Sequence, residues 1–304
     1  MSFQPVQRID TRVFARLPER LRIKDRRSGW AFGKGSDQLH SFLEGPAFDR
    51  AGNLYVTDIP YGRVLRVTPD AEWSMVTEYD GWPNGLAIHK DGRIFIADHK
   101  RGILALDAAS GQVEPVLEHV RREGFKGTND LTFASNGDLY FTDQGQTGLQ
   151  DPSGRVFRLR ANGDVDCLLD KVPSPNGLVL SKDEKTLFLA VTRANQIWRV
   201  PLHPDGTTSK VGTYINMSGG GGPDGMALAD NGSLAVAHVG LGAVWIFDRL
   251  GESVYRLVSC EGLSTTNIAF GGPRQTTLFI TESDSGTILA AEVGMAGCAL
   301  YSHM

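Results

Sequence analysis

A phrase recurs six times along the chain, and this repeat constrains the fold more than any other feature. In each copy a polar residue precedes a short apolar run, a turn rich in Gly, Asn and Asp follows, and a second apolar run ends the phrase. The copies are LEGPAFDRAGNLYVTD (43–58), PNGLAIHKDGRIFIAD (83–98), TNDLTFASNGDLYFTD (128–143), PNGLVLSKDEKTLFLAVT (175–192), GGPDGMALADNGSLAVAH (221–238) and TTNIAFGGPRQTTLFITE (265–282). Such internal repetition indicates a repeat architecture.

The polar residue before each first apolar run gives the period. These landmark residues are Glu44, Asn84, Asn129, Asn176, Asp224 and Thr266, spaced 40 to 48 residues apart. That period is typical of a four-stranded propeller blade. Within the second copy, Asp-Gly between two apolar runs is a strong hairpin signal. The units therefore read as strands, and long helical periodicity is missing.

Six units predict an all-β fold, a six-bladed β-propeller formed by one domain over residues 1–304. The last unit lacks an outer strand, and the N-terminal stretch TRVFARLPE (11–19) resembles the outer strands of other units. We therefore expect an N-terminal strand to complete the last blade and close the ring. Residues 18–40, which are polar and basic, would form an insertion over one face.

The six landmarks should surround one mouth of the central channel, because the first strand of each blade lines that channel. The end of each second strand lies beside them, which adds a second ring of side chains. Asn and Asp before a strand often only satisfy local backbone donors. We favour that architectural interpretation for Asn84 and Thr266, and for most of the second ring it is at least as good as a functional one. The second ring is Asp58, Asp98, Asp143, His238 and Glu282.

Four landmarks suggest a metal site. Glu44 and Asp224 are carboxylates, and Asn129 and Asn176 offer amide oxygens. Such an all-oxygen shell with a charge of −2 suits Ca²⁺ in particular, with Mg²⁺ or Mn²⁺ as alternatives. Zn²⁺ also accepts oxygen ligands, but no set of His or thiolate residues converges here.

Bulk composition excludes several other functions. The net charge is −4 at pH 7, without a block of like charges, so we expect neither nucleic acid nor a membrane as partner. No apolar run approaches 18 residues. The N-terminus lacks the apolar segment of a signal peptide, and three widely spaced cysteines indicate reduced thiols in a cytoplasmic protein. Nothing indicates an oligomeric state.

The motifs EGPAF, TNDLTF…DLYFTD, PNGLVLSKDEKTLFLA and GPDGMALADNG resemble those of the superfamily of gluconolactonase, regucalcin (senescence marker protein) and luciferin-regenerating enzyme. The resemblance covers about residues 41–292. Diisopropyl fluorophosphatase and the staphylococcal drug-responsive lactonase are similar relatives. The resemblance implies a six-bladed propeller with one catalytic divalent metal held by Glu44, Asn129, Asn176 and Asp224. It also implies that Asp224 acts as general base or nucleophile.

Other residues near the predicted mouth are candidates for supporting roles. Asp130 would orient the metal ligands, and Asp143 and His238 are alternative bases. Two basic residues of the loop RREGFKGTND, Arg121 and Lys126, would reach a substrate carboxylate or hydroxyl, although a solvated surface charge is the commoner role. The Trp82 side chain would shape an apolar pocket or simply pack. They are candidates of lower rank than the four ligands.

The predicted reaction is the hydrolysis of a lactone, a small-molecule ester, by a metal-dependent enzyme. The metal would act as Lewis acid on the carbonyl, and water would attack while Asp224 takes its proton. A metal bound to Asp224 lowers its pKa, which counts against a strong base. Two alternatives stay open: an organophosphate or phosphoester hydrolase using the same site, and a propeller that binds Ca²⁺ or a partner without catalysis.

Overall fold

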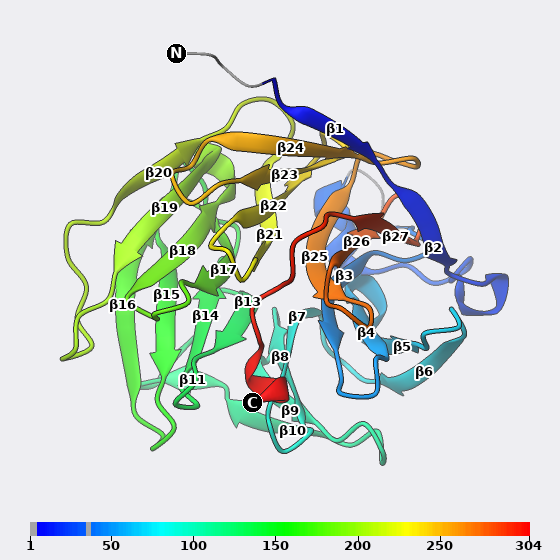
Figure 1. Cartoon of the computed structure of the whole chain (residues 1–304). Coiled ribbons are helices and arrows are strands. Elements are labelled where there is room, and N and C mark those ends of the chain that lie inside the picture. Colours follow the sequence, from blue (N-terminus) through cyan, green and yellow to red (C-terminus); the bar gives the residue numbers. More distant parts are fainter. Residues whose placement is uncertain (1–4, 35–37) are drawn as a thin grey trace.

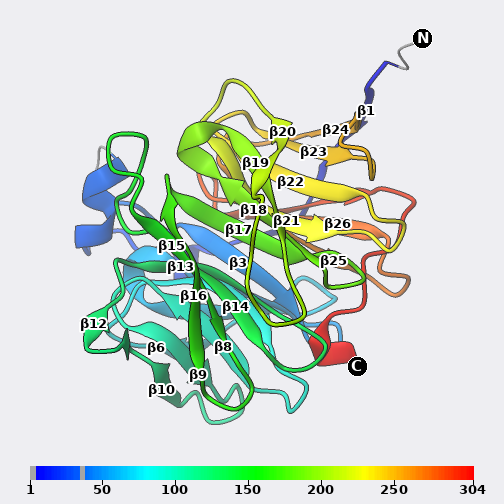
Figure 2. The same ribbon diagram turned by 90° about the vertical axis from the view of Figure 1, so that its left-hand side faces the viewer.

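The computed structural model describes residues 5–34 and 38–304, and its strands form six sheets around a central axis (Figure 1). The first strand of each sheet contacts the first strand of the next, and the sixth contacts the first, so the ring is closed. The structure is therefore the six-bladed β-propeller that the repeat predicts. Figure 2 shows the ring turned by 90° about the vertical axis.

The strands of each blade run in sequence order from the axis outward. Blade one is β3 (Leu43–Phe48), β4 (Leu54–Asp58), β5 (Arg63–Val67) and β6 (Trp73–Glu78). Blade two is β7 (Pro83–Ile88), β8 (Ile94–Asp98), β9 (Gly102–Leu106) and β10 (Val113–Leu117). Blade three is β13 (Thr128–Phe133), β14 (Leu139–Asp143), β15 (Gly154–Leu159) and β16 (Val165–Val172). A short hairpin, β11 (His119–Val120) and β12 (Glu123–Gly124), precedes blade three.

The second half of the ring repeats this order. Blade four is β17 (Pro175–Leu180), β18 (Thr186–Val191), β19 (Gln196–Pro201) and β20 (Gly212–Asn216). Blade five is β21 (Gly222–Leu228), β22 (Leu234–Val239), β23 (Ala243–Phe247) and β24 (Ser253–Val258). Blade six has β25 (Thr265–Gly271), β26 (Thr277–Glu282) and β27 (Thr287–Glu292).

The N-terminal segment adds one strand to each of two blades. As predicted, β2 (Arg12–Arg16) pairs antiparallel with β27 and becomes the outer strand of blade six. Ala15 and Leu17 then pack with Leu43 and other apolar side chains between blades six and one. A second N-terminal pairing was not predicted: β1 (Gln7–Asp10) pairs parallel with β24 of blade five.

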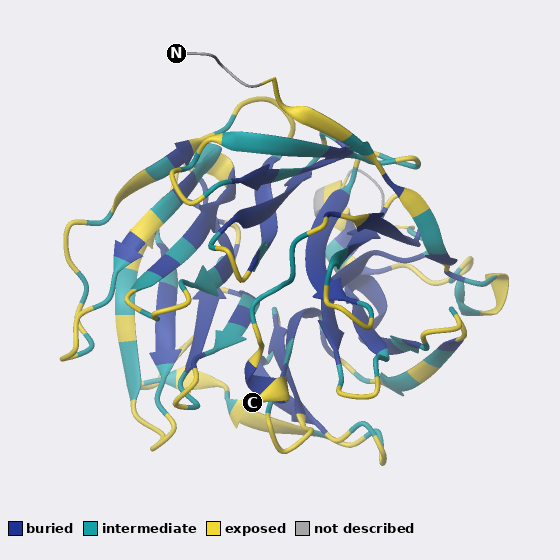
Figure 3. Cartoon of the chain, in the orientation of Figure 1, coloured by how far each residue is buried: buried dark blue, intermediate teal, exposed yellow. Residues whose placement is uncertain are grey.

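Burial follows the same geometry. The inner strands are largely buried, while outer strands such as β10 and β16 have mostly exposed or half-buried residues (Figure 3). The sheets pack through apolar clusters that each span two neighbouring blades, as between blades one and two with Val64, Leu86 and Ile96. This packing holds the loops at both ends of the channel in place.

Part of the 18–40 segment lies against the channel mouth formed by the landmark residues; its residues 35–37 are outside the described part of the chain. The segment contains the 3-10 helices η1 (Glu19–Leu21) and η2 (Gly29–Lys34). Ser28 Oγ donates a hydrogen bond to the carbonyl of Pro60 at 2.7 Å, at the end of blade one. The Trp30 ring packs on Phe42, directly before β3, with a centroid distance of 4.7 Å.

The C-terminal residues 297–304 cross the opposite end of the channel. Cys298 N–H donates to the carbonyl of Leu228 at 2.9 Å, and the Tyr301 ring packs on His89 and Phe133 from blades two and three. Arg50 of blade one donates to the carbonyl of Ser302 at 2.6 Å. The tail thus connects both sides of the ring, and in Figure 1 it passes across the centre. No helix in the described residues is long and apolar enough to cross a membrane.

The ring closure gives a first prediction. Ala15→Asp should lower the free energy of unfolding by about 3 kcal/mol or more, because a carboxylate would be buried without a partner between blades six and one. Arg12→Asp, on the exposed side of the same strand, should change it by less than about 0.5 kcal/mol. Urea unfolding measures both. Equal effects would mean that β2 does not contribute to the core.

Candidate metal centre

Close approach of neighbouring inner strands brings the landmark residues together. The residue after the landmark is Gly in four blades, and a Cβ there would collide with the next blade. At Gly45, whose φ is +54°, it would lie 2.3 Å from the carbonyl oxygen of Asn84; at Gly177 it would lie 2.4 Å from that of Asp224. Glycine at this position therefore allows the strands to converge at the mouth.

The four predicted ligands all begin inner strands at this mouth, and all are buried. Glu44 is 4 %, Asn129 6 %, Asn176 7 % and Asp224 7 % exposed. Asn176 donates a side-chain hydrogen bond to Asp224. The Asn129 amide nitrogen donates to Gln144 Oε1 at 3.0 Å, which leaves its amide oxygen as the group available to a cation.

Two further polar residues lie deeper in the channel, from opposite blades three and six. Asn267 Nδ2 donates to Asp130 Oδ2 at 3.4 Å and also makes a side-chain hydrogen bond to Glu44. Asn267 was missed by the sequence argument, which took Thr266 as the landmark. The available signal was position: Asp130 and Asn267 occupy the two places where the other four copies have Gly after the landmark.

Three carboxylates in this small buried region have raised pKa values, with burial as the largest cause for each. Burial raises the pKa of Glu44 to about 7, against the opposing effects of the Gly45 N–H, Asn267 and Lys34. Burial and the charge of Glu44 raise the pKa of Asp130 to about 7. The same two causes raise the pKa of Asp224 well above its usual range. Such a cluster is costly to ionise without a cation.

A divalent metal fits this donor set. The two carboxylates and two amide oxygens are hard ligands, and a cation between them would favour the ionised form of both carboxylates and so oppose the effect of burial on their pKa values. Within the described residues, no three His, Cys, Asp or Glu side chains are grouped so that they could hold a metal by themselves. A site here thus depends on the amide oxygens of Asn129 and Asn176. This composition favours an oxygen-preferring ion over Zn²⁺.

Lys34 is a basic residue at the mouth that no sequence pattern indicated. Its ammonium lies 4.4 Å from the centroid of the Phe42 ring and 5.0 Å from that of Trp30. Although the residue retains exposed surface, burial of the ammonium lowers the pKa of Lys34, while Asp224 and Glu44 oppose that effect. The 18–40 segment therefore places a cation beside the carboxylates.

Most of the second ring is held by bonds within each blade. Asp143 accepts the Gly127 N–H at 2.8 Å and pairs with Arg155 at 2.6 Å, so it fixes the loop that enters β13. Asp58 does the same for the Phe42 N–H and Arg63. These contacts match the architectural interpretation.

His238 is likewise engaged outside the ligand cluster. Its Nε2 lies 2.9 Å from the Gly219 carbonyl under the glycine run, and burial lowers the pKa of its imidazole. The Nδ1 atom is buried without a hydrogen-bond partner among the described residues. This position gives no hydrogen bond to Glu44 or Asp224 in the described part of the chain.

The remaining candidates lie around the mouth or outside it. The Trp82 ring packs beside His99 at 5.8 Å and under Lys100, and a Cβ at Gly29 would lie 3.6 Å from it. Lys126 donates to Ser153 Oγ at 2.8 Å. Arg121 is exposed in the turn between β11 and β12. Neither basic side chain makes a hydrogen bond or ion pair with a landmark in the described residues.

Comparison with known proteins assigns the family. Residues 42–284 match the family model described as SMP-30/Gluconolactonase/LRE-like region, and the chain belongs to this family. It is 31% identical to a gluconolactonase of Zymomonas mobilis, over 79% of this chain and 76% of that protein. It is 32% identical to lactonase drp35 of Staphylococcus epidermidis, over 71% of this chain and 69% of that protein.

Solved structures show the same fold. A gluconolactonase of Xanthomonas campestris superposes with a TM-score of 0.75 at 23% identity, covering 95% of this chain and 98% of that one. Regucalcin of Agrobacterium tumefaciens, a calcium-binding protein, superposes with a TM-score of 0.77 at 20% identity, covering 99% and 100%. The resemblance drawn from the motifs is thereby confirmed.

The raised pKa of Glu44 predicts how stability depends on pH in metal-free protein. The Glu44 carboxyl has a pKa of 4.5 in the unfolded chain and of about 7 in the folded chain, so the folded chain binds the proton more tightly. The free energy of unfolding therefore falls as pH rises from 4.5 through 7. For Glu44 this loss is on the order of 3 kcal/mol. Urea unfolding in chelator at pH 5 and pH 8 should show a smaller loss in Glu44→Gln than in wild type.

Asp143→Asn provides the contrast. It should lower stability at both pH values, by about 3 kcal/mol, because Arg155 would lose its buried partner. If stability depended on pH in Glu44→Gln as it does in wild type, the pKa of Glu44 would not be raised in the metal-free protein.

Proposed function

We propose that this chain is a metal-dependent lactonase that opens the ester bond of a small lactone. The buried cluster of Glu44, Asp224, Asn129 and Asn176 at one channel mouth carries the proposal. The relatives named lactonase and gluconolactonase supply the reaction class. A divalent ion, with Ca²⁺ favoured by the oxygen donors, would be held by these four side chains.

The bound ion would supply Lewis-acid polarisation of the lactone carbonyl. Asp224 is the group best placed to take a proton from the attacking water, because its carboxylate lies at the mouth and is oriented by Asn176. Asp130 and Asn267 position the cluster from below, since Asn267 bonds both Glu44 and Asp130. Burial of all these groups keeps bulk water from screening their charges.

Lys34 has a separate role in this proposal. Its ammonium interacts electrostatically with Asp224 and Glu44 and lies over two aromatic rings, which supports this role. It would donate a hydrogen bond to a hydroxyl or carbonyl oxygen of the substrate. The 18–40 segment would then act as a cover that contributes to substrate binding.

A metal-dependence assay tests the activity. After treatment with chelator, Ca²⁺, Mg²⁺, Mn²⁺ or Zn²⁺ is added back singly, and a pH indicator reports acid release from sugar lactones, aliphatic lactones and dihydrocoumarin. We expect one ion to restore turnover in wild type. Glu44→Gln should reduce kcat about 100-fold or more at saturating metal, because the ion loses an anionic ligand.

Glu114→Gln is the matched control, since Glu114 is exposed on β10, and it should retain full activity. Asp224→Asn, unlike this control, should lack turnover while remaining folded. Normal activity in that variant would remove Asp224 from the mechanism. Silence on every lactone with metal bound would overturn the proposed reaction and direct the assay to phosphoesters.

Lys34→Met should raise KM for lactones by about tenfold and change kcat less, because a charged hydrogen bond to bound substrate is lost. Lys185→Met, at an exposed turn of blade four, is the control and should leave KM unchanged. A steady-state titration with the best lactone from the screen measures both. An unchanged KM in Lys34→Met would exclude contact between Lys34 and substrate.

A further inference from the structure

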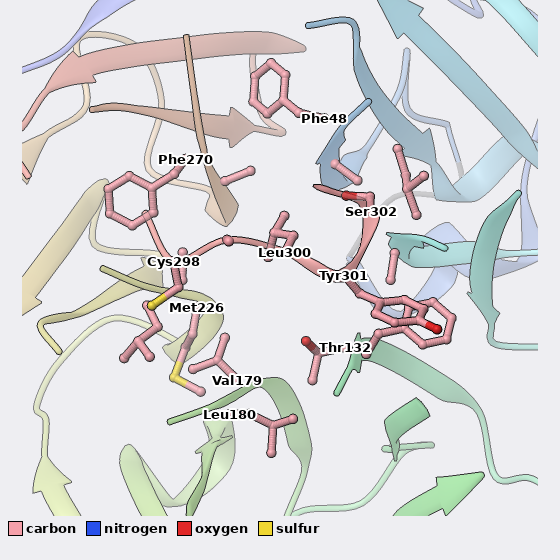
Figure 4. A pocket seen from close by; sticks show the side chains of 18 of the residues that line it. Phe48, Thr132, Val179, Leu180, Met226, Phe270, Cys298, Leu300, Tyr301 and Ser302 are labelled. Atoms are coloured by element: carbon pink, nitrogen blue, oxygen red, sulfur yellow. The ribbon is translucent and has the colours of Figure 1, made fainter. Parts of the chain in front are cut away.

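A cavity of about 390 Å³ fills the half of the channel opposite the candidate metal ligands. The second halves of all six inner strands line it, and most of the side chains they contribute are apolar. Figure 4 shows Val179, Met226 and Phe270 around it. An apolar cavity of about 150 Å³ already binds benzene, so this one accommodates a molecule roughly twice that size.

The C-terminal tail roofs this cavity. Leu300 and Tyr301 lie across it in Figure 4, and both line it. The tail is anchored at each end, by the bond from Cys298 to Leu228 and by Arg50 on Ser302. An opening to solvent remains beside blades four and five, where the exposed pair of Lys182 and Asp230 belongs to the lining. The cavity is thus covered but accessible.

Its inner end is polar. Asp130 and Asn267 line the cavity there, and the Thr132 hydroxyl, from the same strand as Asp130, is a further polar group of the lining (Figure 4). The bond between Asp130 and Asn267 is long, 3.4 Å, and joins opposite blades. It offers an incoming group one acceptor, on Asp130, next to one donor, the Asn267 amide nitrogen.

We propose that this cavity is a second binding site, separate from the metal mouth, for a small uncharged molecule with a hydrocarbon body and one hydroxyl group. A hydroxyl donates one hydrogen bond and accepts another, which matches the Asp130 and Asn267 side chains. A carboxylate would face the Asp130 carboxylate, and an ammonium, although attracted to Asp130, would leave its other donors unpaired against apolar walls. The hydrocarbon body fills the space beneath the tail.

Isothermal titration of the metal-loaded full chain with three matched probes tests this site. The probes are 4-butylphenol, 4-butyltoluene and 4-butylbenzoate, which share a body and differ in the head group. We expect 4-butylphenol to bind with a Kd below about 1 mM, at least tenfold more tightly than 4-butyltoluene, and the benzoate not to bind. No binding of the phenol, or equal binding of phenol and toluene, would overturn the proposal.

Cavity-filling variants locate the binding. Val179→Phe places a ring in the cavity and should weaken 4-butylphenol binding at least tenfold; Ala227→Leu, at another lining position, should do the same if the first variant is unstable. Val116→Phe makes the same change on the exposed face of β10 and should leave binding intact. Unweakened binding in a folded filled variant would place the phenol elsewhere and overturn the assignment.

Discussion

The close convergence of six inner strands at one end of the channel is the constraint on which the site depends. It is achieved where a glycine follows the landmark residue, since a Cβ at Gly45 or Gly177 would collide with the neighbouring strand. The cost is that polar side chains from distant parts of the sequence are forced together in a buried space. The metal site proposed at the mouth would be a consequence of this packing.

Burial and charge then limit how many carboxylates at the mouth can be ionised at once. Glu44, Asp130 and Asp224 cannot all be ionised cheaply at this depth, and their raised pKa values express that conflict. By contrast, the equally buried Asp58 and Asp143 each have an arginine and a backbone N–H as partners. Two sets of carboxylates that look alike in the repeat thus differ in whether the chain itself neutralises them. The unneutralised set is the one that we propose holds a cation from outside.

The repeat was sufficient to predict the number of blades, the closure by β2 and the residues that gather at the mouth, because each follows from a period and a strand register. Features without a repeat could not be found in this way. The pairing of β1 with β24 is made by main-chain groups, and the path of the tail depends on the contacts of Cys298 with Leu228 and of Tyr301 with Phe133. Lys34 lies in the insertion, where no second copy exists for comparison.

The sequence analysis missed Asn267 for a different reason. The repeat contained the information, but the polar residue nearest the expected position, Thr266, was taken as the landmark. In the structure the Thr266 hydroxyl bonds to the Leu43 carbonyl and to the hydroxyls of Thr281 and Ser283, which fits the architectural role expected for it. The following residue is the one that reaches the axis.

The Asp130 and Asn267 pair also divides the channel into two environments. On one side lie the buried carboxylates proposed to hold a cation, and on the other an apolar cavity covered by the chain's own tail. Asn267 bonds Glu44 on the first side and lines the cavity on the second. A group that displaces the Asn267 amide from Asp130 necessarily alters the surroundings of Glu44, because the same amide nitrogen serves both carboxylates. The two halves of the channel are therefore separate in chemistry but share one hydrogen-bonding residue.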